Sequence, residues 1–139
     1  MSPRDPQADA SRWLAQAEND LEFARHGLRL GFHAQTCFLS QQVAEKAAKA
    51  IHYRRGVRVV LGHSVDGLLE ALGVEDAEVT ELRAFAKQLD QHYVPARYPN
   101  ALPGSVPFQA YTEEQAARAV EAATRILALA QRLVAAPGV

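Results

Sequence analysis

One stretch of the chain decides the fold: His33–Tyr53 has the sequence HAQTCFLSQQVAEKAAKAIHY. It has no Gly or Pro, and it is rich in Ala and other residues with high helix propensity. Its apolar residues cover more than half of a helix circumference; they are Ala34, Cys37, Phe38, Val43, Ala44, Ala47, Ala48 and Ile51. Such a helix needs neighbours on several sides. We therefore predict that it is the central helix of an all-α domain.

Four polar residues, Gln42, Glu45, Lys46 and Lys49, keep the remaining part of this helix hydrophilic. Glu45 and Lys49 are four residues apart, in the order that favours an ion pair worth about 0.3–0.5 kcal/mol on an exposed helix. The simplest interpretation is a solvated stripe. The functional alternative is that Lys46 and Lys49 reach an anionic ligand, with Gln42 adding an amide.

Patterns on both sides of this stretch predict its neighbours. We expect a first helix to begin at Asp9 or Ser11, after a frayed N-terminal segment over residues 1–9, and to end near Leu30. The other expected helices are a short one from Val65 to Leu72 capped by Ser64, one from Asp76 to about Tyr93, and a last one opened by a Thr112/Gln115 capping box. Residues 57–61 have a strand-like composition but no partner strand, so we expect an extended loop.

Composition limits the class of protein. The chain has 139 residues, 48% of them hydrophobic, which suits one domain over residues 1–139. Its net charge of −1 argues against sequence-independent coating of nucleic acid, although a local basic site stays open. Cys37 is the only cysteine, so no disulfide forms within the chain. No signal peptide and no apolar run of about 20 residues is found, which predicts a soluble cytoplasmic protein without a membrane span.

A long segment from Val94 to Ala110, VPARYPNALPGSVPFQA, precedes the last helix. Its four prolines and one glycine predict an irregular loop, and long loops inside small domains are often functional. Arg97 and Tyr98 lie in this loop, close in sequence to Tyr93. A guanidinium beside aromatic rings suits a nucleotide, because it bonds phosphate oxygens while a ring stacks on the base. Alternatively, Arg97 ties the loop down by bonding backbone carbonyls or an acidic neighbour.

Three ordered motifs resemble one family. Leu39–Tyr53 resembles the Q-x-A-E-K-x-x-K-A helix of HEPN (higher eukaryotes and prokaryotes nucleotide-binding) domains. Gly62–Leu69, GHSVDGLL, is similar to that family's G-H-x4-L-L segment, and Gln91–Pro99, QHYVPARYP, is similar to its Y-x-P-x-R-Y-P segment. An opening helix of the form A-x-x-D-L-x-x-A is present over Ala17–Ala24. The resemblance covers essentially the whole chain.

The expected helices form an antiparallel four-helix up-and-down bundle, with an additional short helix and the Pro-rich loop before the last helix. The resemblance implies that such a HEPN bundle usually dimerises, and that in bacteria it is often encoded beside a minimal nucleotidyltransferase as a toxin–antitoxin pair. We therefore expect a homodimeric nucleotide-binding module that partners a separately encoded minimal nucleotidyltransferase. Its candidate binding residues are Arg97, Tyr98, Tyr93, Lys46 and Lys49. RNA is an alternative ligand, and a purely architectural dimer is an alternative role.

The enzyme alternative is a metal-independent ribonuclease, because many HEPN proteins carry an R-x(4–6)-H motif. Arg58 and His63 match it literally, but they lie between the second and third helices rather than near the last two. Position 65 is Val65 instead of a Tyr, and no His follows Arg97 within six residues. We therefore interpret His63 as a polar residue that fixes the loop, and favour a binding module over an enzyme. The sequence has no H-E-x-x-H motif, Cys/His cluster or Gly-rich phosphate loop, so we predict no metal and no cofactor.

Overall fold

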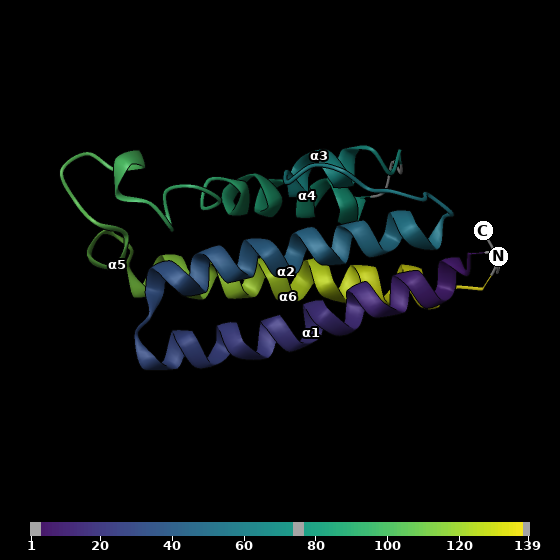
Figure 1. The fold of residues 1–139 in the computed structure, drawn as a ribbon, viewed down its shortest axis with the longest axis horizontal. Coiled ribbons are helices and arrows are strands. Elements are labelled where there is room, and N and C mark those ends of the chain that lie inside the picture. Colours follow the sequence, from purple (N-terminus) through teal and green to yellow (C-terminus); the bar gives the residue numbers. More distant parts are fainter. Residues whose placement is uncertain (1–3, 74–76, 138–139) are drawn as a thin grey trace.

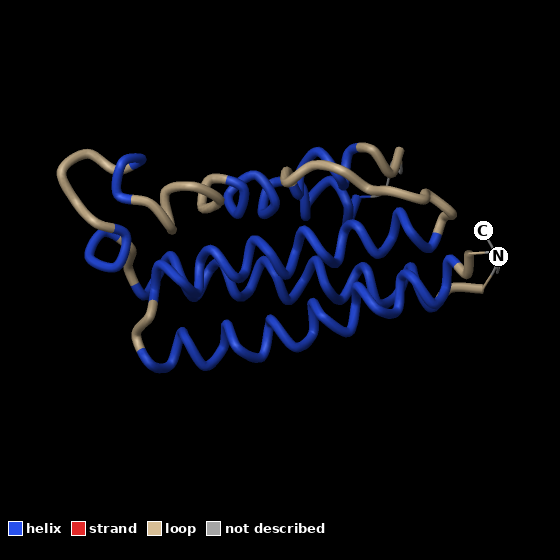
Figure 2. Tube along the Cα trace, viewed as in Figure 1, coloured by secondary structure: helices blue, strands red, loops and turns tan. Residues whose placement is uncertain are grey.

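The computed structural model describes residues 4–73 and 77–137. Its elements, in chain order, are α1 (Pro6–Leu30), α2 (His33–Arg54), α3 (Val65–Glu70), α4 (Ala77–Asp90), the 3-10 helix η1 (Pro99–Ala101), α5 (Pro107–Ala110) and α6 (Glu113–Ala135). The described residues contain helices and loops but no strand (Figure 2). The predicted all-α class is therefore confirmed.

The helix over His33–Arg54, α2, is the centre of the bundle. It contacts α1, α3, α4, α5 and α6. The long helices α1, α2, α4 and α6 alternate in direction, with α1 on one side of α2 and α6 and with α3 and α4 on the other (Figure 1). Buried alanines such as Ala44, Ala47 and Ala48 allow these helices to pack closely against α2. The prediction of a central helix in an up-and-down bundle is confirmed.

The hairpin between α1 and α2 is closed by Gly31, whose φ of 84° is left-handed and suits glycine. Near this turn the two helices approach so closely that a Cβ on Gly27 would lie 2.5 Å from Thr36 Oγ1. The predicted start of α1 was wrong, since the helix begins at Pro6. Asp5 caps it by accepting the N–H groups of Gln7 and Ala8, and proline is favoured in the first turn.

Two helix starts follow their predicted caps. Ser64 accepts the Gly67 N–H at 3.0 Å and opens α3, although α3 ends at Glu70 rather than Leu72. Thr112 and Gln115 form both bonds of the capping box that opens α6. The predicted cap Asp76 lies outside the described residues. The helix α4 ends at Asp90, three residues before the predicted end, and turns follow it.

The segment from Val94 to Ala110 contains two short helical pieces, so the prediction of a wholly irregular loop was wrong. Both η1 and α5 begin at a proline, Pro99 and Pro107, because the fixed φ of proline favours the first helical position. The segment after α2 is an extended loop, as predicted, and runs back towards α3 (Figure 2). None of the described helices is both long and apolar enough to cross a membrane.

Candidate functional site

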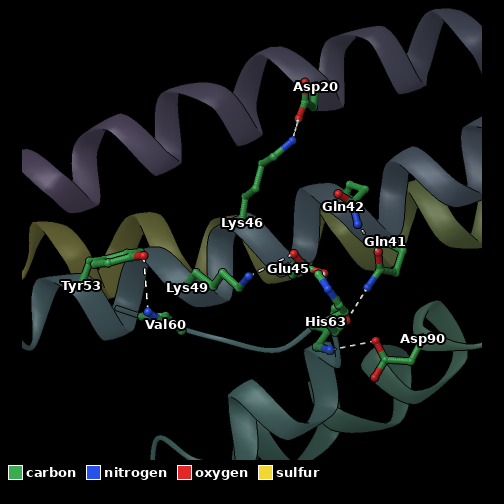
Figure 3. Close-up of polar contacts among 11 residues, drawn as sticks. Asp20, Gln41, Gln42, Glu45, Lys46, Lys49, Tyr53, Val60, His63 and Asp90 are labelled. Atoms are coloured by element: carbon green, nitrogen blue, oxygen red, sulfur yellow. Dashed lines mark hydrogen bonds and ion pairs between the residues drawn. The ribbon is translucent and has the colours of Figure 1, made fainter. Parts of the chain in front are cut away.

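The polar stripe on α2 is largely buried. Glu45 is 6% exposed and Lys49 7% exposed, and the carboxylate of Glu45 accepts from Lys49 Nζ at 3.3 Å. His63, in the loop after α2, lies on the other side of the same carboxylate, with its Nδ1 3.2 Å from Glu45 Oε1 (Figure 3). The interpretation of a solvated stripe is therefore wrong for Glu45 and Lys49, because the loop before α3 crosses this part of α2.

Both lysines of the stripe have acidic partners within the chain. Lys46 pairs with Asp20 across the α1–α2 contact, and Lys49 pairs with Glu45 (Figure 3). The ammonium of Lys49 also lies 5.8 Å from the centre of the Trp13 ring. These contacts keep both ammonium groups packed against side chains of α1 and α2.

His63 is fixed at three points. Its carbonyl accepts from Gln41 Nε2 at 2.7 Å, its Nδ1 faces Glu45, and its ring stacks on Tyr93 with centroids 4.9 Å apart and planes 18° apart. This geometry agrees with the interpretation that His63 fixes the loop before α3. Because the carboxylate paired with Lys49 is an acceptor, Nδ1 carries the proton. The side chain is 62% exposed, and its Nε2 makes no hydrogen bond to the described residues.

Arg58 and His63 do not form a pair. The carbonyl of Arg58 accepts from Arg4 near the start of α1, and its side chain is exposed. His63 lies instead beside Glu45 and Tyr93. Within residues 4–73 and 77–137 no hydrogen bond or ion pair joins the Arg58 and His63 side chains. The R-x4-H sequence match therefore does not correspond to an assembled site.

Arg97 lies at the centre of an aromatic cluster. Its Nε–H donates to the Tyr93 carbonyl at 2.7 Å, so the residue does tie down the loop. Its guanidinium carbon also lies 4.5 Å from the Phe38 centroid, 4.6 Å from that of Tyr93 and 5.0 Å from that of Tyr98. In the part of the chain that the structure describes, its terminal nitrogens have no hydrogen bond and no carboxylate. The guanidinium is thus held in place, and its two terminal nitrogens remain able to donate hydrogen bonds to a ligand.

Arg97 borders a surface pocket of about 500 Å³ between α1, α2, the Pro-rich segment and α5. The lining residues are Phe23, Ala34, Gln35, Phe38, Leu39, Ala96, Arg97, Pro107 and Phe108. The pocket is apolar except for one amide and one guanidinium, which is the usual make-up of a small-molecule site, and its volume is in the usual range. Three residues of this pocket, Gln35, Phe38 and Phe108, were not predicted from the sequence. Of these three, only Phe108 could have been suspected from the sequence, because it is an aromatic residue directly after Pro107 in the Pro-rich segment.

Burial shifts the pKa of three side chains, Cys37, His92 and Tyr111. Burial raises the pKa of the Cys37 thiol to about 12, which makes it a poor nucleophile. Burial lowers the pKa of His92 and raises that of Tyr111, and the His92 Nδ1 lies 3.3 Å from the Tyr111 hydroxyl. Across residues 4–73 and 77–137, no three His, Cys, Asp or Glu side chains come together as a metal site.

The fold and the pocket together define a small all-α module with an arginine–aromatic site. The chain belongs to the HEPN domain family, whose model matches residues 10–133. The chain is similar to TT1696 from Thermus thermophilus, with 42% identity and a TM-score of 0.82 over 89% of this chain and 97% of that structure. It is also similar to ST0689, an archaeal HEPN homologue, with 35% identity and a TM-score of 0.76 over 90% of this chain and 97% of that one.

A curated relative gives a further likeness. The chain is 29% identical over 127 residues to a Methanocaldococcus jannaschii protein named "Putative toxin MJ1304", and the match covers 85% of this chain and 83% of that protein. The family resemblance predicted from the motifs is thus confirmed.

Proposed function

We propose that this HEPN protein binds a nucleotide at Arg97. The observation that carries the proposal is the state of its guanidinium, which is fixed by one backbone hydrogen bond and three rings but has no carboxylate partner among the described residues. A guanidinium held in this way presents two parallel donors to a phosphate. Because the side chain is already ordered, binding costs less conformational entropy.

The pocket beside Arg97 has side chains that can stack on a nucleotide base and form hydrogen bonds with its edge. Phe38 and Phe108 offer aromatic faces for stacking, and the amide of Gln35 offers one acceptor and two donors to the edge of a base. Tyr98, half exposed, adds a further ring next to the guanidinium. Lys46 and Lys49 do not line the pocket, and their ammonium groups face Asp20 and Glu45.

Titration calorimetry with AMP in EDTA tests the binding. Replacing the cation, as Arg97→Ala, is expected to weaken AMP binding about tenfold or more, as loss of a charged hydrogen bond worth about 1.5–3 kcal/mol does. Arg125→Ala is a matched control, because Arg125 also lies over a ring, 4.7 Å from the Phe85 centroid, but pairs with Glu81 and does not line the pocket. Equal affinities in both variants would contradict the proposal.

We also propose that the protein is one component of a two-gene toxin–antitoxin system with a minimal nucleotidyltransferase. The name of the M. jannaschii relative, a putative toxin, supports the toxin part of this proposal. The neighbouring reading frame is expected to encode a short protein with a G-S-x(n)-D-x-D signature. Co-expression with one purification tag is expected to recover both proteins, and recovery of the HEPN protein alone would count against the pairing.

The competing proposal is a metal-independent ribonuclease. It predicts that the purified protein degrades RNA in EDTA and that Arg58→Ala and His63→Ala each abolish the degradation. The binding proposal predicts no degradation by the wild type, because the structure brings no general base to Arg58. A purely architectural module predicts neither degradation nor AMP binding.

The expected homodimer has a candidate surface at the α1–α2 turn. Two exposed apolar side chains, Leu30 and Phe32, lie there, outside the lining of the Arg97 pocket. Soluble monomers seldom expose such groups together, and a twofold dimer covers the same patch on both copies. Leu30→Asp is expected to convert a dimer to a monomer in light scattering. Leu61→Asp, at an equally exposed leucine elsewhere, is expected to leave the mass unchanged.

A further inference from the structure

The ring of Tyr93 contacts both Arg97 and His63, the histidine that the R-x4-H match had paired with Arg58. One contact of its ring is with the Arg97 guanidinium, 4.6 Å from the ring centroid, and another is with the His63 imidazole, 4.9 Å away and nearly parallel. His63 does not line the pocket itself. The Tyr93 ring nevertheless contacts both the His63 imidazole and the Arg97 guanidinium, which we propose binds phosphate.

The imidazole of His63 is oriented by a buried acid. Glu45 faces both His63 Nδ1 and Lys49 Nζ, and it is almost completely removed from solvent. The Nδ1–H therefore points inward, and Nε2 is on the exposed side of the ring. When neutral, Nε2 is an acceptor and repels an anion; when protonated, it is a donor with a positive charge.

The charges that surround His63 are otherwise balanced. On α2, Glu45 is matched by Lys49. Asp90, at the end of α4, accepts from the start of α3 and brings one further negative charge, while Arg97 brings one positive charge. Because Glu45 is already paired with Lys49, a proton on His63 adds one positive charge to this group of side chains.

We propose that His63 is a second anion-binding group of the Arg97 site, charged at acidic pH and positioned by Glu45, so that phosphorylated nucleotides bind more tightly as the pH falls. The inference rests on the proposed nucleotide function and extends it. It places the phosphates of the nucleotide, rather than the base, on the side of the site next to Tyr93. Histidine is the side chain that gains its charge between about pH 5 and pH 8. One added charge several ångströms from a phosphate at a protein surface changes affinity about fivefold.

The test compares ADP binding by the wild type and by His63→Gln in EDTA, at about pH 5.5 and about pH 8. ADP also gains a proton in this range, but it does so equally in both titrations, so the difference between the proteins belongs to His63. The wild type is expected to gain about fivefold more affinity on acidification than His63→Gln does. Glu45→Gln is expected to reduce that gain, and adenosine, which has no phosphate, is expected to show none.

A second measurement does not depend on a variant that folds. In the wild type, the imidazole resonances of His63 are followed by NMR against pH, with and without ADP. Bound ADP is expected to move the midpoint of the His63 titration to higher pH, and an unchanged midpoint overturns the inference.

The outcomes separate the two proposals. Binding of ADP that depends on Arg97 but has the same pH profile in the wild type and His63→Gln overturns the inference and leaves the nucleotide site intact. No binding of ADP by the wild type at either pH overturns the nucleotide site, and the role of His63 with it.

Discussion

Arg97 is joined to Tyr93 twice, through a 2.7 Å hydrogen bond from Nε to the Tyr93 carbonyl and through a 4.6 Å contact between the guanidinium and the Tyr93 ring. The hydrogen bond is accepted by the backbone carbonyl of Tyr93 and does not involve its side chain. The ring contact depends on the side chain. The two contributions to the orientation of Arg97 are therefore separable by mutation.

Removing the ring of Tyr93 is expected to weaken nucleotide binding without unfolding the protein. Tyr93→Leu loses contacts to both Arg97 and His63, and a cation–π contact is worth about 0.5–1 kcal/mol at an exposed site, which corresponds to about a two- to fivefold loss of AMP affinity. Tyr93→Phe keeps the ring and is expected to bind like the wild type. Equal losses in both variants would show that the hydroxyl, and not the ring, is important.

Asp90 is expected to contribute strongly to the stability of α3. Its carboxylate accepts from Ser64 Oγ at 2.8 Å, from the Val65 N–H at 2.8 Å and from the Asp66 N–H at 3.1 Å, which joins the end of α4 to the start of α3. We expect Asp90→Ala to lower the free energy of unfolding by about 1–3 kcal/mol in urea denaturation. The exposed Glu114→Ala, which removes a pair with Arg118 and one of the acidic side chains in the first turn of α6, should cost less, about 0.5–1 kcal/mol.

The close approach of α1 and α2 at Gly27 predicts a compensating pair of substitutions. Gly27→Ala places a methyl group 2.5 Å from Thr36 Oγ1 and is expected to cost about 1–3 kcal/mol. Thr36→Ala removes that oxygen, which is buried and has no hydrogen-bond partner among the described residues. The double variant should therefore be more stable than Gly27→Ala alone in thermal unfolding. A simple sum of the two single effects would argue against direct contact.

His92 is expected to make stability depend on pH. Burial lowers the pKa of His92 below its ordinary value of 6.5, so the unfolded chain binds a proton that the folded chain resists. The free energy of unfolding should then be highest above about pH 7 and should fall as the pH decreases through about 6.5. His92→Gln is expected to show a shallower fall in urea denaturation between about pH 7 and about pH 5. Identical slopes in the two proteins would exclude His92 as the cause.

Local signals explain most of what the sequence predicted correctly. The Thr112/Gln115 capping box and the Ser64 cap depend on residues within three positions of each other, so their bonds follow from the sequence alone. The central position of α2 followed from the breadth of its apolar surface. The start of α1 at Pro6 was missed because proline was taken as a sign of disorder rather than as a first helical residue.

Contacts between distant segments explain what was missed. The stripe on α2 looks solvated in a helical projection, because the projection does not contain the loop that brings His63 over Glu45. The pocket likewise unites Phe23, Gln35 and Phe108, which lie on three different helices. Arg97 was predicted because it lies in the long Pro-rich loop close in sequence to Tyr93 and Tyr98, whereas its third ring, Phe38, comes from α2 and is distant in the sequence.

The direction of the helices has a practical consequence for the attachment of the protein to a surface. Helix α1 begins and α6 ends at one end of the bundle, while the α1–α2 turn and α5, which borders the pocket, are at the other (Figure 1). A tag, surface linker or fluorescent fusion attached before α1 or after α6 is therefore held about the length of a helix, roughly 30 Å, from Phe108. The protein can be immobilised by either terminus with its candidate site facing the solution.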